Sequence, residues 1–200
     1  MSYWTQTSPL APLLTFADVA THLQLDPDVA ALATEQDYVN SLIDAATAYA
    51  EDKLDSSLVT RTVTAVYFTN QDLAQNPYTF PVNAWNPMAF SLGKQLLLAL
   101  PRGPFQAIST VTDANGTFAG VTVERYGVSD WLSLPQRFAT PLTVTFTAGY
   151  GSTAASVPAN IRAAVRALVM HLYENRGEAE AKHPEWIDSF LRVRSRGIGI

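Results

Sequence analysis

Apolar residues recur at helical spacing in two stretches near the start of the chain. The first predicts a short helix over residues 16–23. Thr15 lies just before it and Asp18 in its first turn, and the two form an acidic variant of the capping box. The second predicts a longer amphipathic helix over residues 35–54, with Thr34 as the expected cap. These stretches indicate a group of N-terminal helices.

The pattern changes to a period of two after the second helix. Residues 58–68 alternate and are rich in β-branched side chains, which predicts a strand with no wholly polar face. Further strands are predicted at residues 95–100, 107–112, 121–126 and 142–147, with a hairpin signal at residues 113–116. Together they predict a small region of about four to six antiparallel strands.

The last regular pattern is a long amphipathic helix. Residues 149–151 are glycine-rich and end an alternating strand, and Pro158 suits the first turn of a helix that extends to Arg176. Its apolar stripe consists of Ile161, Val165, Leu168, Val169 and Leu172. Gly177 is expected to terminate this helix.

Three segments lack a clear period. Residues 1–14 are expected to form an arm, residues 70–94 a long inserted loop, and residues 125–141 an irregular span. The sequence therefore predicts an α+β fold: N-terminal helices, a small antiparallel β region with an inserted loop, and a long C-terminal amphipathic helix followed by an extended tail. Residues 1–178 are expected to form a single α+β domain, and residues 179–200 a C-terminal helix and tail.

Composition narrows the range of possible functions. The chain has 200 residues, of which 48% are hydrophobic, so it can bury a sizeable core. Its 13 basic and 18 acidic residues give a net charge of −5, which argues against tight sequence-independent DNA binding. The absence of cysteine excludes disulfides, thiolate metal sites and cysteine nucleophiles. The start of the chain lacks a signal-peptide pattern, and the run at residues 96–100 is too short to span a bilayer, so no membrane association is expected.

No catalytic, cofactor-binding or metal site is predicted. His171 and Glu174 lie one helical turn apart and could share a metal with acidic residues that follow the helix, but no second helix offers a matching pair of ligands. A surface or partly buried helix histidine is the simpler interpretation. Residues 149–152 lack the nucleophile elbow of hydrolases because their serine follows the second glycine, so a turn is the favoured use of these glycines.

An aromatic cluster in the predicted loop is the first candidate interaction surface. Its members are Tyr78, Phe80, Trp85 and Phe90. Aromatic residues are enriched at protein interfaces, so we expect a protein contact, with packing of the loop over its own small core as the alternative. Stacking on bases or sugars is less favoured because Lys94 is the only basic residue nearby.

The end of the chain is the second candidate. Arg192, Arg194 and Arg196 alternate with other residues, and Ile198 and Ile200 follow them. This period of two with flanking glycines suits an extended segment that adds to the surface or sheet edge of a partner. The alternative is a frayed terminus.

Five segments, taken in order, carry a family resemblance. They are residues 38–51, 58–62, 100–105 together with the strand 108–111, 146–151 and 158–176. In this order they resemble the head–tail connector (portal adaptor) proteins of tailed bacteriophages and phage-like particles. The resemblance covers residues 15–178, and the inserted loop is longer and more aromatic than the family pattern.

The resemblance implies a structural protein without enzymatic activity. Members of this family assemble as a homo-oligomeric ring, commonly dodecameric, beneath the portal in the virion neck, and are assembled in the bacterial host cytoplasm. The ring extends the DNA channel, through which double-stranded DNA passes without specific binding, and docks a stopper or tail protein. The C-terminal segment engages the portal, which agrees with the separate interpretation of Arg192 to Ile200. The aromatic loop would then contact the tail, the stopper or a neighbouring subunit.

Two other functional classes stay open at this point. A tail-completion protein would share the ring but would bind the tail tube in place of the portal. A small hydrolase or carbohydrate-binding module would use the aromatic loop, and would require a closed pocket with a buried pair of carboxylates.

Overall fold

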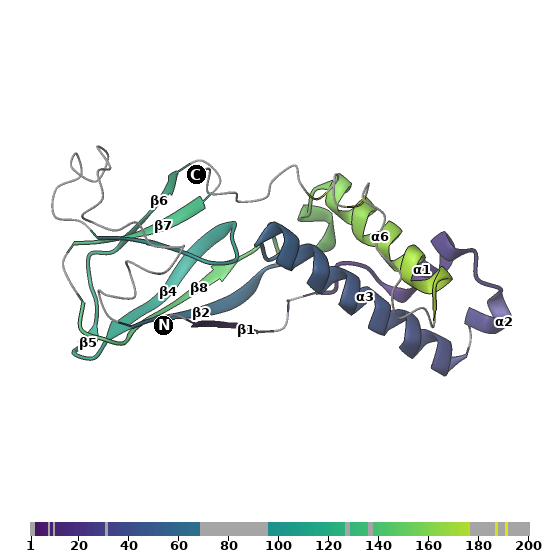
Figure 1. Ribbon diagram of the computed structural model, residues 1–200, viewed down its shortest axis with the longest axis horizontal. Helices are drawn as coiled ribbons and strands as arrows, with labels where there is room; N and C mark the ends of the chain where they lie inside the picture. The colour runs from purple at the N-terminus through teal and green to yellow at the C-terminus, as the bar shows by residue number, and fades with distance from the viewer. Residues whose placement is uncertain are drawn as a thin grey trace. The chain divides into compact units, whose positions relative to one another are not determined.

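The computed structural model describes residues 3–7, 9, 11–30, 32–68, 96–126, 129–135, 138–176, 187 and 191. The chain divides into two compact units. Met1–Pro9 and Thr60–Gly149 form the first, which we call the β unit. Leu10–Val59 and Tyr150–Ile200 form the second, which we call the helical unit. The predicted α+β fold class is confirmed, and Figure 1 shows its helices and antiparallel strands.

The helical unit is built on two long helices. These are α3, Ala33–Leu54, and α6, Ala159–Glu174, which pack against each other. The short helix α1, Phe16–Leu23, contacts both of them, and α2, Pro27–Ala30, contacts α3. A single 3-10 turn, Ala154–Ser156, precedes α6. No helix in the described part of the chain is long and apolar enough to cross a membrane.

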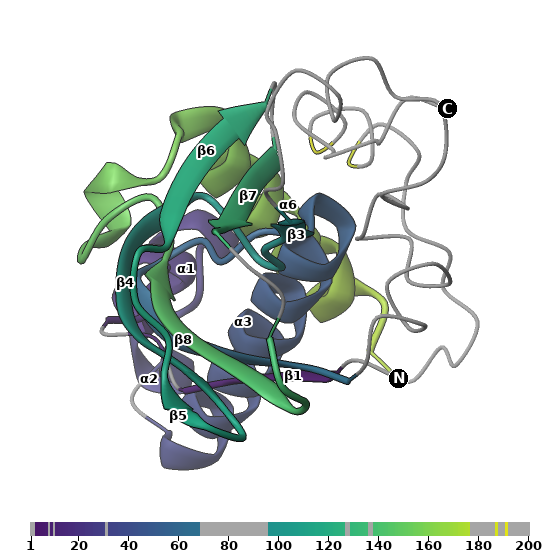
Figure 2. The same cartoon turned by 90° about the vertical axis from the view of Figure 1, so that its left-hand side faces the viewer.

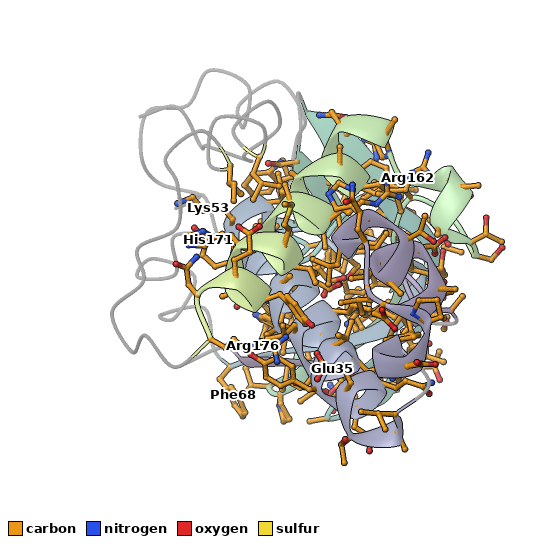
Figure 3. The ribbon with its side chains drawn as sticks, turned by 90° about the vertical axis from the view of Figure 1, so that its right-hand side faces the viewer. Glu35, Lys53, Phe68, Arg162, His171 and Arg176 are labelled. Carbon is orange, nitrogen blue, oxygen red and sulfur yellow. The ribbon has the colours of Figure 1, made fainter. Side chains whose placement is uncertain are left out.

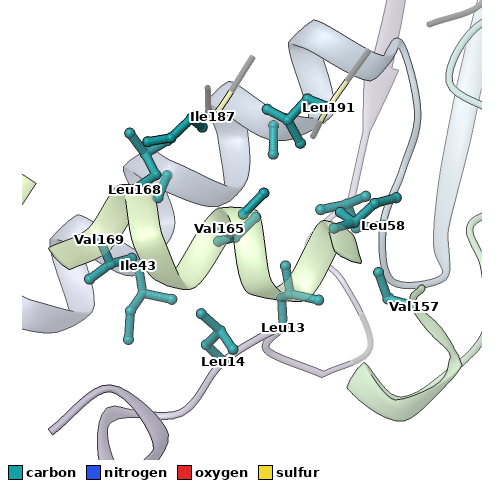
Figure 4. Close-up of a cluster of buried hydrophobic side chains, with 14 of the residues drawn as sticks. Leu13, Leu14, Ile43, Leu58, Val157, Val165, Leu168, Val169, Ile187 and Leu191 are labelled. Carbon is teal, nitrogen blue, oxygen red and sulfur yellow. The ribbon is translucent and has the colours of Figure 1, made fainter. Parts of the chain in front are cut away.

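One apolar core holds the helical unit together (Figure 4). The predicted stripe of α6 lies in it, with Ile161, Val165, Leu168 and Val169 each at most 3% exposed. The facing residues of α3 and the segment before α1 complete it; they include Leu13, Leu14, Val39, Ile43, Ala46, Ala50 and Leu54. Burial of this stripe supplies the main stabilisation of α6, because a helix of this length is marginal in isolation.

The helix starts show which sequence signals act as caps. At α1 the predicted capping box is present: Thr15 Oγ1 accepts from Asp18 N, and Asp18 Oδ2 accepts from Thr15 N at 3.0 Å. At α3 the prediction that Thr34 caps the helix is wrong. The amide groups of Glu35 and Gln36 both donate to Leu32 O at 3.1 Å, so the helix begins before Thr34.

The β unit contains two antiparallel sheets. The first has the order β1-β2-β8-β4-β5, and its strands are Tyr3–Gln6, Arg61–Tyr67, Leu142–Ala148, Phe105–Asp113 and Gly116–Thr117. The second has the order β3-β7-β6, and its strands are Leu96–Ala99, Ser129–Leu134 and Thr122–Tyr126. Figure 2 shows β4 and β8 curving side by side, while β6 and β7 form a separate pair. β2 pairs with β8 on the side opposite β4.

The core of the β unit lies between the inner faces of its two sheets. Val63, Val144 and Phe146 from the five-stranded sheet are fully buried, as are Leu98 and Leu132 from the three-stranded sheet. Because side chains alternate along a strand, the residues between these positions on β2 and β8 point to the opposite face. This core is separate from the one that holds α3 and α6.

Two strands lie where none was predicted. β1 falls in the expected arm, and β7 in the expected irregular span. The predicted hairpin is confirmed, since Asp113 pairs with Gly116 and Thr112 with Thr117. The expected loop at residues 70–94, Gly177 and the tail lie outside the described residues, apart from Ile187 and Leu191, which are fully buried in the helical core.

Candidate functional site

Both segments predicted to bind partners lie outside the described residues. These are the aromatic cluster Tyr78, Phe80, Trp85 and Phe90, and the tail residues Arg192, Arg194, Arg196, Ile198 and Ile200. The structure therefore brings none of them together with other residues in the part that it describes. The described residues offer candidate surfaces on each of the two units.

His171 has a local partner on its own helix. Asn175 Nδ2 lies 3.1 Å from His171 Nδ1 and also donates to His171 O at 2.7 Å. Within the described ranges, no three His, Asp or Glu side chains are grouped closely enough to hold a metal ion. His171 therefore takes part in closing the last turn of α6, through its contacts with Asn175.

A cluster of four side chains joins the start of α3 to the end of α6 (Figure 3). Tyr173 donates its hydroxyl to Glu35 Oε1 at 2.6 Å, and Arg176 Nη2 donates to the same oxygen at 3.0 Å. The Arg176 guanidinium also stacks on the Tyr173 ring, 3.9 Å from its centroid, and lies 5.2 Å from the Tyr38 centroid. We call these four residues the helix clasp. It fixes the point at which the chain leaves α6.

Each ionisable group of the helix clasp is shifted by its neighbours. The hydroxyl of Tyr173, and then the guanidinium of Arg176, lower the pKa of Glu35. Burial raises the pKa of Tyr173, and the bond to Glu35 raises it further. Burial alone would lower the pKa of Arg176, but its bond to Glu35 and its contact with Tyr173 outweigh burial and raise it. The clasp is therefore built to keep Glu35 ionised and Tyr173 protonated.

A second polar cluster lies in the β unit and was not found from the sequence. Asp130 is 2% exposed and sits on β7. Its Oδ2 accepts from Phe105 N at 2.8 Å, its Oδ1 accepts from Arg125 Nε at 2.8 Å, and its backbone oxygen accepts from Leu100 N at 2.9 Å. The bond to Asp130 raises the pKa of Arg125. Asp130 thus ties the three-stranded sheet to the first residue of β4 in the other sheet.

The outer face of the five-stranded sheet is lined with threonine. Register places Thr5, Thr64, Thr145 and Thr110 in one row across four strands. Neighbouring rows add Thr62, Thr112, Thr117, Thr143 and Thr147, and we call the whole set the threonine face. No residue paired in these rows is charged. The face offers hydroxyl and methyl groups, which neither attract nor repel a polyanion strongly.

The helical unit has a very different charge. Its described residues include ten acidic side chains: Asp18, Asp26, Asp28, Glu35, Asp37, Asp44, Glu51, Asp52, Asp55 and Glu174. Against these stand Lys53, Arg162, Arg166 and Arg176. The exposed residues Asp37, Asp44 and Asp52 recur at helical spacing along one side of α3. The unit therefore presents negative charge along its longest helix.

Comparison with solved structures relates this fold to one kind of particle. The chain matches a chain in the neck of an empty GTA particle, computed with C6 symmetry, with a TM-score of 0.71, 19% identity, and coverage of 95% of this chain and 93% of the other. It has the fold of a gene transfer agent neck chain. Identity at this level establishes the fold alone. No family model and no curated protein matches the sequence.

Two further solved structures agree with this result. A chain from the virion of a native gene transfer agent (GTA) particle matches with a TM-score of 0.68 and 20% identity, over 97% of this chain and 94% of the other. A chain from the neck of a native GTA particle, computed with C12 symmetry, matches with a TM-score of 0.64 and 18% identity, over 95% and 93%. The matches extend over nearly the whole of each chain, so both units are shared with these virion components.

Proposed function

We propose that this protein is a structural head–tail connector, or adaptor, of a tailed phage or phage-like particle. The observation that carries the proposal is the nearly end-to-end match of both units to neck chains from particles solved with C6 and C12 symmetry. The resemblance of the sequence to head–tail connector proteins supports the same role. The protein would act as a building block in the virion neck and would have no enzymatic activity.

In this role the copies form a closed ring beneath the portal protein. A cyclic ring uses heterologous interfaces, in which one face of a subunit meets a different face of its neighbour. The ring would extend the channel for double-stranded DNA and dock a stopper or tail protein. The acidic helical unit and the uncharged threonine face support passage of DNA without binding, because neither offers the clustered cations that phosphates require.

The two segments outside the described residues complete the proposal. We assign portal binding to the tail within residues 179–200, through Arg192, Arg194, Arg196, Ile198 and Ile200. We assign a contact with the stopper, the tail or a neighbouring subunit to Tyr78, Phe80, Trp85 and Phe90. Residues 1–178 would then supply the body of the ring.

Electron microscopy of the purified protein mixed with the portal protein from the same gene neighbourhood tests the proposal. We expect class averages with an added ring of density on one end of the portal. Bare portals, with this protein left unbound, would contradict it. Binding to the tail tube in place of the portal would point to a tail-completion protein.

A truncation separates the tail from the body. Deleting residues 192–200 should abolish portal binding while the circular dichroism spectrum and melting temperature stay those of the full chain. The matched control replaces only Arg192, Arg194 and Arg196 by lysine, which keeps the charge and should retain part of the binding. Unchanged binding by the truncated protein would remove this role from the tail.

A further inference from the structure

The strand β1 is separated along the chain from the rest of its own sheet. Residues 1–9 belong to the β unit, but the next segment, Leu10–Val59, belongs to the helical unit. The chain returns to the β unit only at Thr60. All other strands of the β unit lie in the uninterrupted stretch Thr60–Gly149.

β1 is an edge strand of the five-stranded sheet. It pairs with β2 alone among the described strands, from Tyr3 opposite Val66 to Gln6 opposite Val63. Thr7 extends the pairing, since Thr7 N donates to Thr62 O at 3.0 Å and Thr62 N donates to Thr7 Oγ1 at 3.1 Å.

One contact between side chains also holds β1 at this edge. The Arg102 guanidinium lies 4.5 Å from the centroid of the Trp4 ring, a cation–π contact in which Arg102 is 7% exposed and Trp4 is 36% exposed. The inward side chains of β2, by contrast, are buried by β8 and the second sheet. None of the described side chains of β1 belongs to that buried core.

Nothing in these contacts depends on which copy of the chain supplies the strand. Residues 3–7 of a neighbouring copy would form the same backbone pairing with β2 and the same hydrogen bonds between Thr7 and Thr62. Their Trp4 would make the same contact with Arg102. Beyond β1, Pro9 and Pro12 favour an extended path, and Leu13 and Leu14 are anchored in the helical core. A terminal strand at a sheet edge, joined by a short connection to a second folded unit, is an element that protomers can exchange at low cost.

We propose that β1 is exchanged between copies in the assembled ring, so that residues 3–7 of each subunit pair with β2 of its neighbour. The inference rests on the proposed ring. One copy gives β1 on one side and receives β1 on the other, which is a heterologous contact and closes when the ring closes. The partner is a second copy of this chain.

Cysteine pairs distinguish exchange from self-pairing, because the native chain contains no cysteine. Thr5 lies directly opposite Thr64 across β1 and β2, and Thr64 lies opposite Thr145 across β2 and β8. Residues opposed in an antiparallel pair have Cα atoms about 4.5–5.5 Å apart, which a disulfide can bridge. The variant T5C/T64C tests the exchange, and T64C/T145C is the matched control within a single unit.

The rings formed with the portal are oxidised and analysed on a denaturing gel without reductant. We expect T5C/T64C to give a ladder of covalent multimers and T64C/T145C to give monomers only. A mixture of affinity-tagged T5C with untagged T64C should give a disulfide-linked heterodimer. If rings are seen by microscopy but T5C/T64C gives only internally bridged monomers, the exchange is overturned and the proposed function stands. If no ring forms with the portal, both are overturned.

Discussion

The helical unit and the β unit bury their apolar cores in different ways. In the helical unit, long helices pack through one apolar stripe, and their outer surfaces are free to carry charge, most of it negative. In the β unit, two sheets enclose the core, and the outer face of the larger one is threonine. The described residues of the β unit contain only Arg61, Arg102, Arg125, Asp113, Glu124 and Asp130 as charged side chains.

The two units also use their polar groups differently. In the helical unit, most of the charged side chains lie on the surface, where the helix clasp joins two helix ends. One carboxylate there, that of Glu51, is 4% exposed and accepts from Leu58 N at 2.9 Å. In the β unit, the buried carboxylate of Asp130 connects the two sheets. The first arrangement sets the charge on the surface of the helical unit, and the second holds the two sheets of the β unit together.

Core truncations should produce the largest effect and test whether the units are separate. Phe146→Ala removes a fully buried ring from the β unit and should cost about 3–5 kcal/mol, and Leu168→Ala in the helical unit about 2–5 kcal/mol. Hydrogen exchange read by mass spectrometry should show lost protection mainly in the unit that carries each change. Equal loss in both units from either variant would mean that they unfold as one.

The Asp130 cluster should produce the next largest effect. Asp130→Asn keeps the size of the side chain but weakens its bonds to Phe105 N and Arg125, and should cost about 1–3 kcal/mol of β-unit stability in urea unfolding. Arg125→Gln is the matched control, and because Arg125 is 57% exposed it should cost less than about 1 kcal/mol. Equal costs would show that the ion pair, and not the backbone contact, is what matters.

The capping box of α1 should contribute less. Thr15→Ala removes the acceptor for Asp18 N and should cost about 1 kcal/mol of helical-unit stability, measured by thermal unfolding. Thr34→Ala should change stability by less than about 0.5 kcal/mol, because Thr34 lies inside α3 and does not cap it. A larger loss at Thr34 than at Thr15 would reverse the assignment of the caps.

The helix clasp should produce the smallest effect, visible mainly in its pH dependence. Because the folded pKa of Glu35 is lowered, its contribution is complete above the ordinary value near pH ~4.3 and is lost as pH falls through the lowered pKa. The stability difference between the native chain and Glu35→Gln should therefore be constant between about pH 5 and 8 and shrink at lower pH.

A control variant isolates the cause of the shift. Tyr173→Phe removes the hydroxyl that lowers the pKa of Glu35 most, so the titration of the Glu35 carboxyl, followed by carbon-13 NMR, should move up toward its ordinary range. No movement of this titration would show that Arg176 alone holds Glu35 ionised.

Much of the fold could be predicted because its periodic patterns are strong. The stripe of α6 and the alternation of β2 and β8 are visible in the sequence, and both became core. β7 was missed because it is buried on both faces, so its side chains do not alternate in polarity. β1 was missed because its four residues are held by pairing with residues about sixty positions away, which no local signal records.

Among the candidate sites, too, contacts between neighbouring residues could be predicted and contacts between distant residues could not. The role of Asp130 depends on partners from three separate parts of the chain, so no spacing in the sequence could reveal it. The helix clasp joins Glu35 to Arg176 across most of the chain. The capping box, by contrast, is a contact between residues three positions apart and was predicted correctly.

We propose that this protein is a ring subunit of a virion neck. Cryo-electron microscopy of necks released from particles of the host that encodes this chain tests it most directly. We expect a ring of repeated density between portal and tail, and each repeat should accept one helical unit and one β unit. A neck map with no density that accepts either unit would contradict it.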